Sequence, residues 1–141
     1  MRDAPSTICI ALDYLSRSVN FGKRIRPVEA RGVAGYYQIM EIGKHGLWFF
    51  LDGMTAPQSA EFARKVEKLG YSALWIPEAV GREPFAHSGY LAAKTDKLIF
   101  ATGIANIWAR DPITMSAASK TIGELSGGRF VLGIGVSHKP L

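Results

Sequence analysis

Four continuous apolar runs after residue 40 are the most regular feature of the chain, and a polar residue follows each of them. Continuous runs of this length are typical of strands that are buried on both faces, as in parallel sheets. The segments between them carry one apolar face and predict helices. The expected strands span about 46–52, 72–77, 98–107 and 129–136, and the expected helices span about 56–69, 84–94 and 112–125.

Start and stop signals agree with this division. Thr55 and Gln58 have the spacing of a capping box at the start of the first helix, and Gly70 is placed to end it. Asp111 followed by Pro112 is a strong start signal for the third helix. Strands that alternate with helices across short connections predict βαβ units, and hence an α/β fold with a parallel sheet.

Residues 1–39 do not share this pattern. They show no sustained helical or strand period, and prolines and glycines are scattered among basic residues. Within them, 8–15 suits a turn or two of helix and 36–39 suits a short strand. We therefore expect an irregular N-terminal extension over residues 1–39, which never had to fold, and a domain over residues 40–141; a genuine N-terminal arm is the alternative.

Composition fits one globular domain, since 48% of the 141 residues are hydrophobic and 21% are charged. The net charge of +5 is drawn mainly from the N-terminal region around 23–26, so we expect a small-molecule partner and no nucleic acid. No apolar run approaches the ~18–20 residues of a membrane span, and no basic region precedes 8–12 as in a signal peptide, so a cytoplasmic location is expected. Cys9 is the only cysteine, which excludes a disulfide framework and a cysteine zinc site, and we expect no metal.

Two architectures fit the alternation, a doubly wound sheet and a (β/α)8 barrel. A dinucleotide-binding sheet would carry Gly-x-Gly-x-x-Gly after its first strand, and the junction 52–57 has no such glycines. A barrel places polar residues at the carboxyl ends of successive strands. Those residues here are Asp52, Glu78, Asn106, and Ser137 with His138. The pattern favours the barrel.

Three segments, in their order and spacing, resemble the bacterial luciferase-like monooxygenase superfamily, and most of all its coenzyme F420-dependent oxidoreductase branch. They are Leu74–Glu78, Ala101–Pro112 and Leu125–Ser137. The resemblance runs from about Gly46 to Leu141. It implies the N-terminal half of a (β/α)8 TIM barrel, with about four β/α units, after the irregular extension.

The resemblance also implies a coenzyme at the carboxyl mouth of the barrel, either F420 or, as the alternative, FMN. Members often carry a cis peptide bond in the third strand that backs the ring, and the matching bond here joins Gly103 to Ile104. Asn106 is then the first polar contact to the ring, although it also suits the cap of a loop. Ser137 is a further expected coenzyme contact. The implied activity is monooxygenation of a small organic substrate, or hydride transfer to one.

Two residues are candidates for catalysis. Glu78 matches an acidic position at the end of the second strand, where it either serves substrate and proton or pairs with Arg82. Many relatives have a histidine directly after this acid, but Ala79 stands there in this chain. His138 follows the fourth strand and has the pKa range for proton transfer, although it lies close to the end of the chain. Arg110 suits either a phosphate or a local pair with the helix cap that follows it.

Four strands are half of what a (β/α)8 barrel contains. We therefore expect this polypeptide to be a fragment of a longer enzyme. An inactive remnant is one alternative, and a half-barrel that assembles with a second copy as a homodimer, or with a complementary chain, is the other.

Overall fold

The computed structural model describes residues 8–11 and 42–136. In order along these residues, the elements are β1 (Ile8–Ala11), β2 (Gly46–Trp48), α1 (Ala56–Lys68), β3 (Ala73–Ile76), α2 (Pro84–Ala92), β4 (Ile99–Thr102), β5 (Ala105–Asn106), α3 (Pro112–Leu125) and β6 (Phe130–Gly135). Within the described ranges, no helix is long and apolar enough to cross a membrane.

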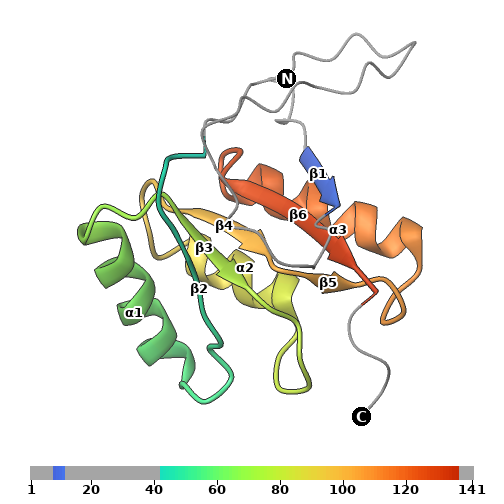
Figure 1. Ribbon diagram of the computed structural model, residues 1–141, viewed down its shortest axis with the longest axis horizontal. Helices are drawn as coiled ribbons and strands as arrows, with labels where there is room; N and C mark the ends of the chain where they lie inside the picture. The colour runs from blue at the N-terminus through green and yellow to red at the C-terminus, as the bar shows by residue number, and fades with distance from the viewer. Residues whose placement is uncertain (1–7, 12–41, 137–141) are drawn as a thin grey trace, which may run out of the picture.

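The strands form a single sheet in the order β1-β6-β4-β3-β2, with β5 also paired to β6, and every pair of neighbours is parallel (Figure 1). This confirms the predicted parallel α/β fold. The expected third strand is divided, because β4 pairs with β3 and β6 whereas β5 pairs with β6. The expected first strand is shorter than predicted, since it ends at Trp48 and the chain then turns so that Leu51 enters the core.

The N-terminal residues that the structure describes differ from the helix expected over 8–15. Ile8–Ala11 is a strand whose residues pair with Val131 to Ile134 of β6 in parallel register. The short apolar sequence Ile-Cys-Ile suits a strand, and β6 offers unpaired backbone groups along its edge. The helical expectation is therefore wrong at these positions. The strand expected at 36–39 lies outside the described residues, and the domain boundary near residue 40 stays a prediction.

Alternate strand residues divide between the two faces of the sheet. One face packs against all three described helices in the larger core, where Phe100 of β4 and Phe130 of β6 are fully buried. Figure 1 shows α2 and α3 behind the sheet and α1 beside β2 and β3. A smaller cluster lies on the opposite face; its buried members are Ala73, Trp75, Ile99, Ala101 and Val131. Helices on one face and a second apolar cluster on the other are the arrangement of a barrel wall.

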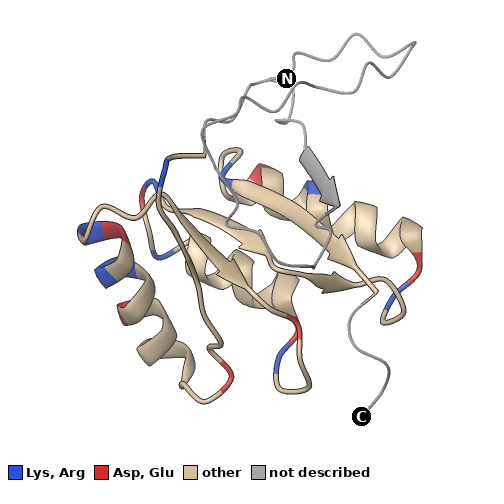
Figure 2. Ribbon diagram, viewed as in Figure 1, with Lys and Arg blue, Asp and Glu red and all other residues tan. Residues whose placement is uncertain are grey.

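The helix signals in the sequence have the expected geometry. Thr55 and Gln58 form the capping box of α1, and Asp111 accepts the first free backbone N–H groups of α3. Gly70 ends α1 with a φ of 85°, a conformation that residues with a Cβ rarely adopt. Figure 2 shows that the charged residues lie on helices and loops and leave the strands of the wall uncharged.

Candidate functional site

The carboxyl ends of the parallel strands meet at one edge of the sheet, as predicted for a barrel. Glu78 follows β3, Gly103 follows β4, and Asn106 ends β5. The backbone N–H of Asn106 donates to Oε2 of Glu78 across 2.6 Å. The structure therefore brings two of the predicted site residues into contact, although they are far apart in the sequence.

The partner of Glu78 is Arg110. Nη1 of Arg110 donates to Oε2 of Glu78 at 2.8 Å, and Nη2 donates to Oε1. The two side chains are 11% and 10% exposed, respectively. The hydrogen bond with Glu78 raises the pKa of Arg110 above its ordinary value, although burial lowers it. Of the alternatives left open by the sequence, the pairing of Glu78 with Arg82 is wrong, and so is the local pair between Arg110 and the helix cap.

Arg82 belongs to a separate cluster that links the loop before α1 to α2. Its Nη1 lies 3.2 Å from Nε2 of His87, and its Nη2 donates to the carbonyl of Met54. Nε2 of His87 also lies 3.0 Å from Oγ of the buried Ser59. Burial, followed by the positive charge of Arg82, lowers the pKa of His87, and Asp52 opposes this effect. His87 therefore joins α2 to Ser59 of α1 and to the loop that carries Arg82.

The peptide bond between Gly103 and Ile104 is cis, as the resemblance implies. Nε1 of Trp48 donates to the carbonyl of Gly103 at 2.7 Å. A Cβ on Gly103 would lie 3.1 Å from Cδ1 of Trp48 and 3.3 Å from Cβ of Trp75. Glycine is therefore the residue that lets the two indole side chains lie this close to the backbone.

Asn106 is half-buried, and its side chain caps the loop that follows. Its Oδ1 accepts from the backbone N–H of Trp108 at 2.9 Å. This is the loop-capping role that the sequence left open. The coenzyme contact expected of Asn106 stays a prediction.

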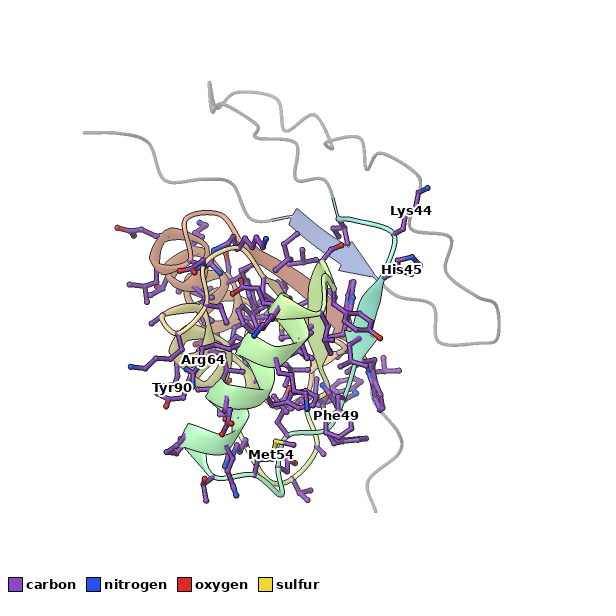
Figure 3. All side chains as sticks on the ribbon, turned by 90° about the vertical axis from the view of Figure 1, so that its left-hand side faces the viewer. Lys44, His45, Phe49, Met54, Arg64 and Tyr90 are labelled. Carbon is purple, nitrogen blue, oxygen red and sulfur yellow. The ribbon has the colours of Figure 1, made fainter. Side chains whose placement is uncertain are left out.

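Aromatic side chains are exposed around the same edge. Trp48 is 46% exposed, and its ring meets that of Phe50 edge to face with centroids 4.8 Å apart. Trp108 is 77% exposed. Figure 3 shows Phe49 and Met54 toward this end of β2, with Lys44 and His45 at the opposite end.

Two contacts at this edge were not predicted from the sequence. They are the Trp48 bond to Gly103 and the pairing of Arg110 with Glu78. The available signal was that Glu78 and Arg110 each come shortly after the end of an expected strand, and no such signal marked Trp48 or Gly103. Ser137 and His138 lie outside the described residues. Among residues 8–11 and 42–136, no group of three or more His, Cys, Asp or Glu side chains is placed to hold a metal ion.

Residues 39–141 match the family model described as luciferase-like monooxygenase. A protein of Mycobacterium tuberculosis, named as a coenzyme F420-dependent oxidoreductase, is 33% identical over 70% of this chain and 29% of its own length. The 5,10-methylenetetrahydromethanopterin reductase of Archaeoglobus fulgidus is 32% identical over 68% of this chain and 29% of its own length. The chain thus spans less than a third of these relatives.

Solved structures share the fold. The coenzyme F420-dependent tetrahydromethanopterin reductase of Methanopyrus kandleri superposes with a TM-score of 0.61 at 24% identity, over 64% of this chain and 26% of the reductase. The oxygenating constituent of 3,6-diketocamphane monooxygenase from Pseudomonas putida, in complex with FMN, gives a TM-score of 0.57 at 21% identity, over 68% of this chain and 30% of the enzyme. The family match covers most of the chain, and the parallel sheet agrees with it: the chain belongs to the luciferase-like monooxygenase family.

Proposed function

We propose that the described residues form the coenzyme-facing edge of an oxidoreductase that uses coenzyme F420, or alternatively FMN, to act on a small organic substrate. The observation that carries this proposal is the segment around Gly103 and Ile104, held beside Asn106 and Glu78 where the parallel strands end. In barrels of this kind, the chemistry takes place at that edge. The names of the similar proteins support F420, and the FMN complex of a similar structure supports the alternative.

The residues at this edge fit a flavin-type ring. Gly103 has no side chain, which lets the indole of Trp48 and Cβ of Trp75 lie against its backbone, so apolar groups back the segment. Asn106 adds an amide beside that surface, and an amide can both donate to and accept from the polar rim of such a ring. When bound, the flavin or deazaflavin supplies hydride or activates dioxygen. The residues of the chain orient the ring and exclude water from it.

We place the complete reaction in a full barrel, to which these residues contribute about four β/α units. The support is that the chain matches about 29% of the length of its relatives. In this proposal, Ser137 contacts the coenzyme and His138 transfers a proton, as the resemblance implies. In the sequence, both come shortly after the last residue of β6, Gly135.

A titration of the whole 141-residue chain tests the proposal. Binding of F420, FMN and NADPH would be followed by calorimetry, with NADPH as the control for a nicotinamide site. We expect saturable binding of F420, weaker binding of FMN, and none of NADPH. Binding of NADPH alone would overturn the proposal. Binding of none of the three would instead favour the inactive remnant, or the assembly module if sedimentation shows a folded dimer.

A further inference from the structure

We propose that Glu78 and Arg110 are a positioning pair that fixes the segment from Gly103 to Arg110, and that Glu78 does not serve as a proton donor. The part that concerns the coenzyme rests on the proposed function, because Gly103 and Asn106 are its expected contacts. The positioning itself depends only on the geometry of this chain.

Glu78 holds the segment at two backbone positions. Its own N–H donates to the carbonyl of Ile104 at 3.1 Å, and its Oε2 accepts from the N–H of Asn106 at 2.6 Å. These bonds attach the segment directly after Gly103 and again at the end of β5. The end of β3 therefore defines where both expected coenzyme contacts lie.

Arg110 holds the far end of the same segment through the same carboxylate. Its guanidinium donates to both oxygens of Glu78, the fork geometry that suits a carboxylate best. The guanidinium also lies over the ring of Phe85, with Cζ 4.9 Å from the centroid. Oε1 of a second carboxylate, that of Glu83, lies 3.4 Å from Nη2 of Arg110, but the Glu83 side chain is 49% exposed. The buried pair with Glu78 is thus the main attachment.

Both oxygens of Glu78 already accept hydrogen bonds from N–H groups. Oε1 accepts from Arg110, and Oε2 accepts from Arg110 and from Asn106. A carboxyl group that donates a proton must carry it on one of these oxygens, and protonation would remove the negative charge on which both bonds from Arg110 to this nearly buried group depend. The arrangement is that of a fixed support.

The middle of the segment has little other support. Trp108 is 77% exposed and Ile107 is 37% exposed. Backbone bonds join the N–H of Ile107 to the carbonyl of Gly135 at 3.0 Å, and the N–H of Ala109 to the carbonyl of Asn106 at 3.3 Å. Few apolar contacts around exposed residues are typical of a region that opens easily. Loss of the Glu78–Arg110 pair should therefore be felt first at Trp108.

Fluorine NMR of the whole chain, labelled with 5-fluorotryptophan, measures this directly. Each resonance would be assigned from single tryptophan-to-phenylalanine variants. Trp108 reports on the segment, Trp48 reports on the carbonyl of Gly103, and Trp75 in the sheet is the internal reference. The two test variants are Glu78→Gln and Arg110→Lys. Glu83→Gln is the matched control in the same cluster, because glutamine keeps the oxygen that caps α2.

We expect both test variants to shift or broaden the Trp108 resonance and to leave that of Trp75 in place. Glu83→Gln should leave all three resonances in place, and so should Glu67→Gln at the other end of the sheet. An unchanged Trp108 resonance in both folded test variants would overturn the proposal. If Glu78→Gln does not fold, as judged by circular dichroism, Arg110→Lys decides by the same criterion.

Coenzyme titrations separate this proposal from the proposed function. If the pair positions the coenzyme contacts, Glu78→Gln and Arg110→Lys should each weaken F420 binding by at least about tenfold, the scale expected when a contact is misplaced. The double variant should lose little more than either single variant, because both remove one unit. If the parent binds no coenzyme, the proposed function fails and the Trp108 resonance still decides the positioning. Tight F420 binding in Glu78→Gln, with turnover alone lost, would show a proton-transfer role and overturn the proposal.

Discussion

Each end of the sheet has a glutamate and an arginine that make several hydrogen bonds, but the groups to which they bond differ between the two ends. At the amino ends of the strands, Glu67 and Arg129 bond to backbone groups. At the carboxyl ends, Glu78 and Arg110 bond to each other and hold a segment that carries exposed residues. At the amino end, the polar side chains satisfy backbone groups of the loops. At the carboxyl end, they fix the position of an exposed segment.

At the amino end of the sheet, side chains provide hydrogen-bond partners for the backbone groups of the loops. Glu67 at the end of α1 accepts from the N–H groups of Asp96, Lys97 and Leu98, at 3.1, 2.6 and 2.7 Å. Arg129 donates to the carbonyls of three loop or helix-end residues, which are Ala92, Leu98 and Ser126, each within 2.9 Å. Backbone groups near the core need such partners, so these side chains contribute to stability.

The carboxyl end differs in what it leaves uncovered. Trp48 and Phe50 lie exposed beside it, and so does Trp108 on the segment that Glu78 holds. An apolar surface with a few fixed polar groups is typical of a ligand site, whereas satisfied loop ends are typical of a scaffold. The comparison predicts that substitutions at the amino end change folding, and that substitutions at the carboxyl end change binding.

Arg129→Ala should have the largest effect of the substitutions considered. It leaves three carbonyls without their guanidinium donor, and each unsatisfied group costs about 1–3 kcal/mol. We expect the free energy of unfolding to fall by about 3 kcal/mol, measured by urea denaturation. Arg64→Ala on the exposed face of α1 is the control. A loss equal to that of the control would show that these bonds contribute nothing.

Gly103→Val should act on binding. The new Cβ would lie 3.1 Å from Cδ1 of Trp48, and forced overpacking costs about 1–3 kcal/mol. We expect the affinity for F420 to fall by more than about 2 kcal/mol, measured by calorimetry. Gly53→Val is the matched control, since no atom lies within 4 Å of a Cβ there. Parent-like affinity in Gly103→Val would remove this segment from the site.

Asn106→Ala should weaken F420 binding by about 1–2 kcal/mol, the usual cost of one lost buried polar partner. The side chain also caps the loop at Trp108, so a second variant is needed. Asn106→Asp keeps the oxygen that accepts from Trp108 but loses the amide donor. If Asn106→Asp binds as the parent does and Asn106→Ala does not, the residue acts as a loop cap and not as a ring contact.

Glu67→Gln should give the smallest effect, and one that depends on pH. Burial raises the pKa of Glu67, but hydrogen bonds from Lys97, Leu98 and Asp96 outweigh it, so the pKa lies below its ordinary 4.5. The ionised carboxylate therefore stabilises the fold at pH values above 4.5, the pKa of the unfolded chain. This stabilisation is lost as the pH falls through the lower pKa of the folded protein. Because the group is partly solvated, we expect a difference of less than about 1 kcal/mol at neutral pH. Urea denaturation at several pH values checks it, and a difference that persists in acid would contradict it.

Most strands and helices of the sheet and its covering layer could be predicted from local sequence. The apolar runs before Glu78 and Asn106, and the caps at Thr55 and Asp111, specify elements through residues close in the chain. The cis bond after Gly103 was expected from family resemblance alone, and the division of the third strand there was not predicted, since no local period shows it. The pairing of Glu78 with Arg110 and the strand at β1 were missed, because each depends on packing between distant segments: Arg110 lies 32 residues from Glu78.

The most direct test of the carboxyl edge as the coenzyme site is a titration of the fluorotryptophan-labelled chain with F420. Trp48 is hydrogen-bonded to Gly103 and Trp108 to Asn106, the two proposed ring contacts, and both indoles are exposed. We predict that their resonances shift together and saturate at one equivalent, and that NADPH moves neither. Saturated binding of F420 with both resonances unmoved, or a shift with NADPH alone, would contradict the assignment.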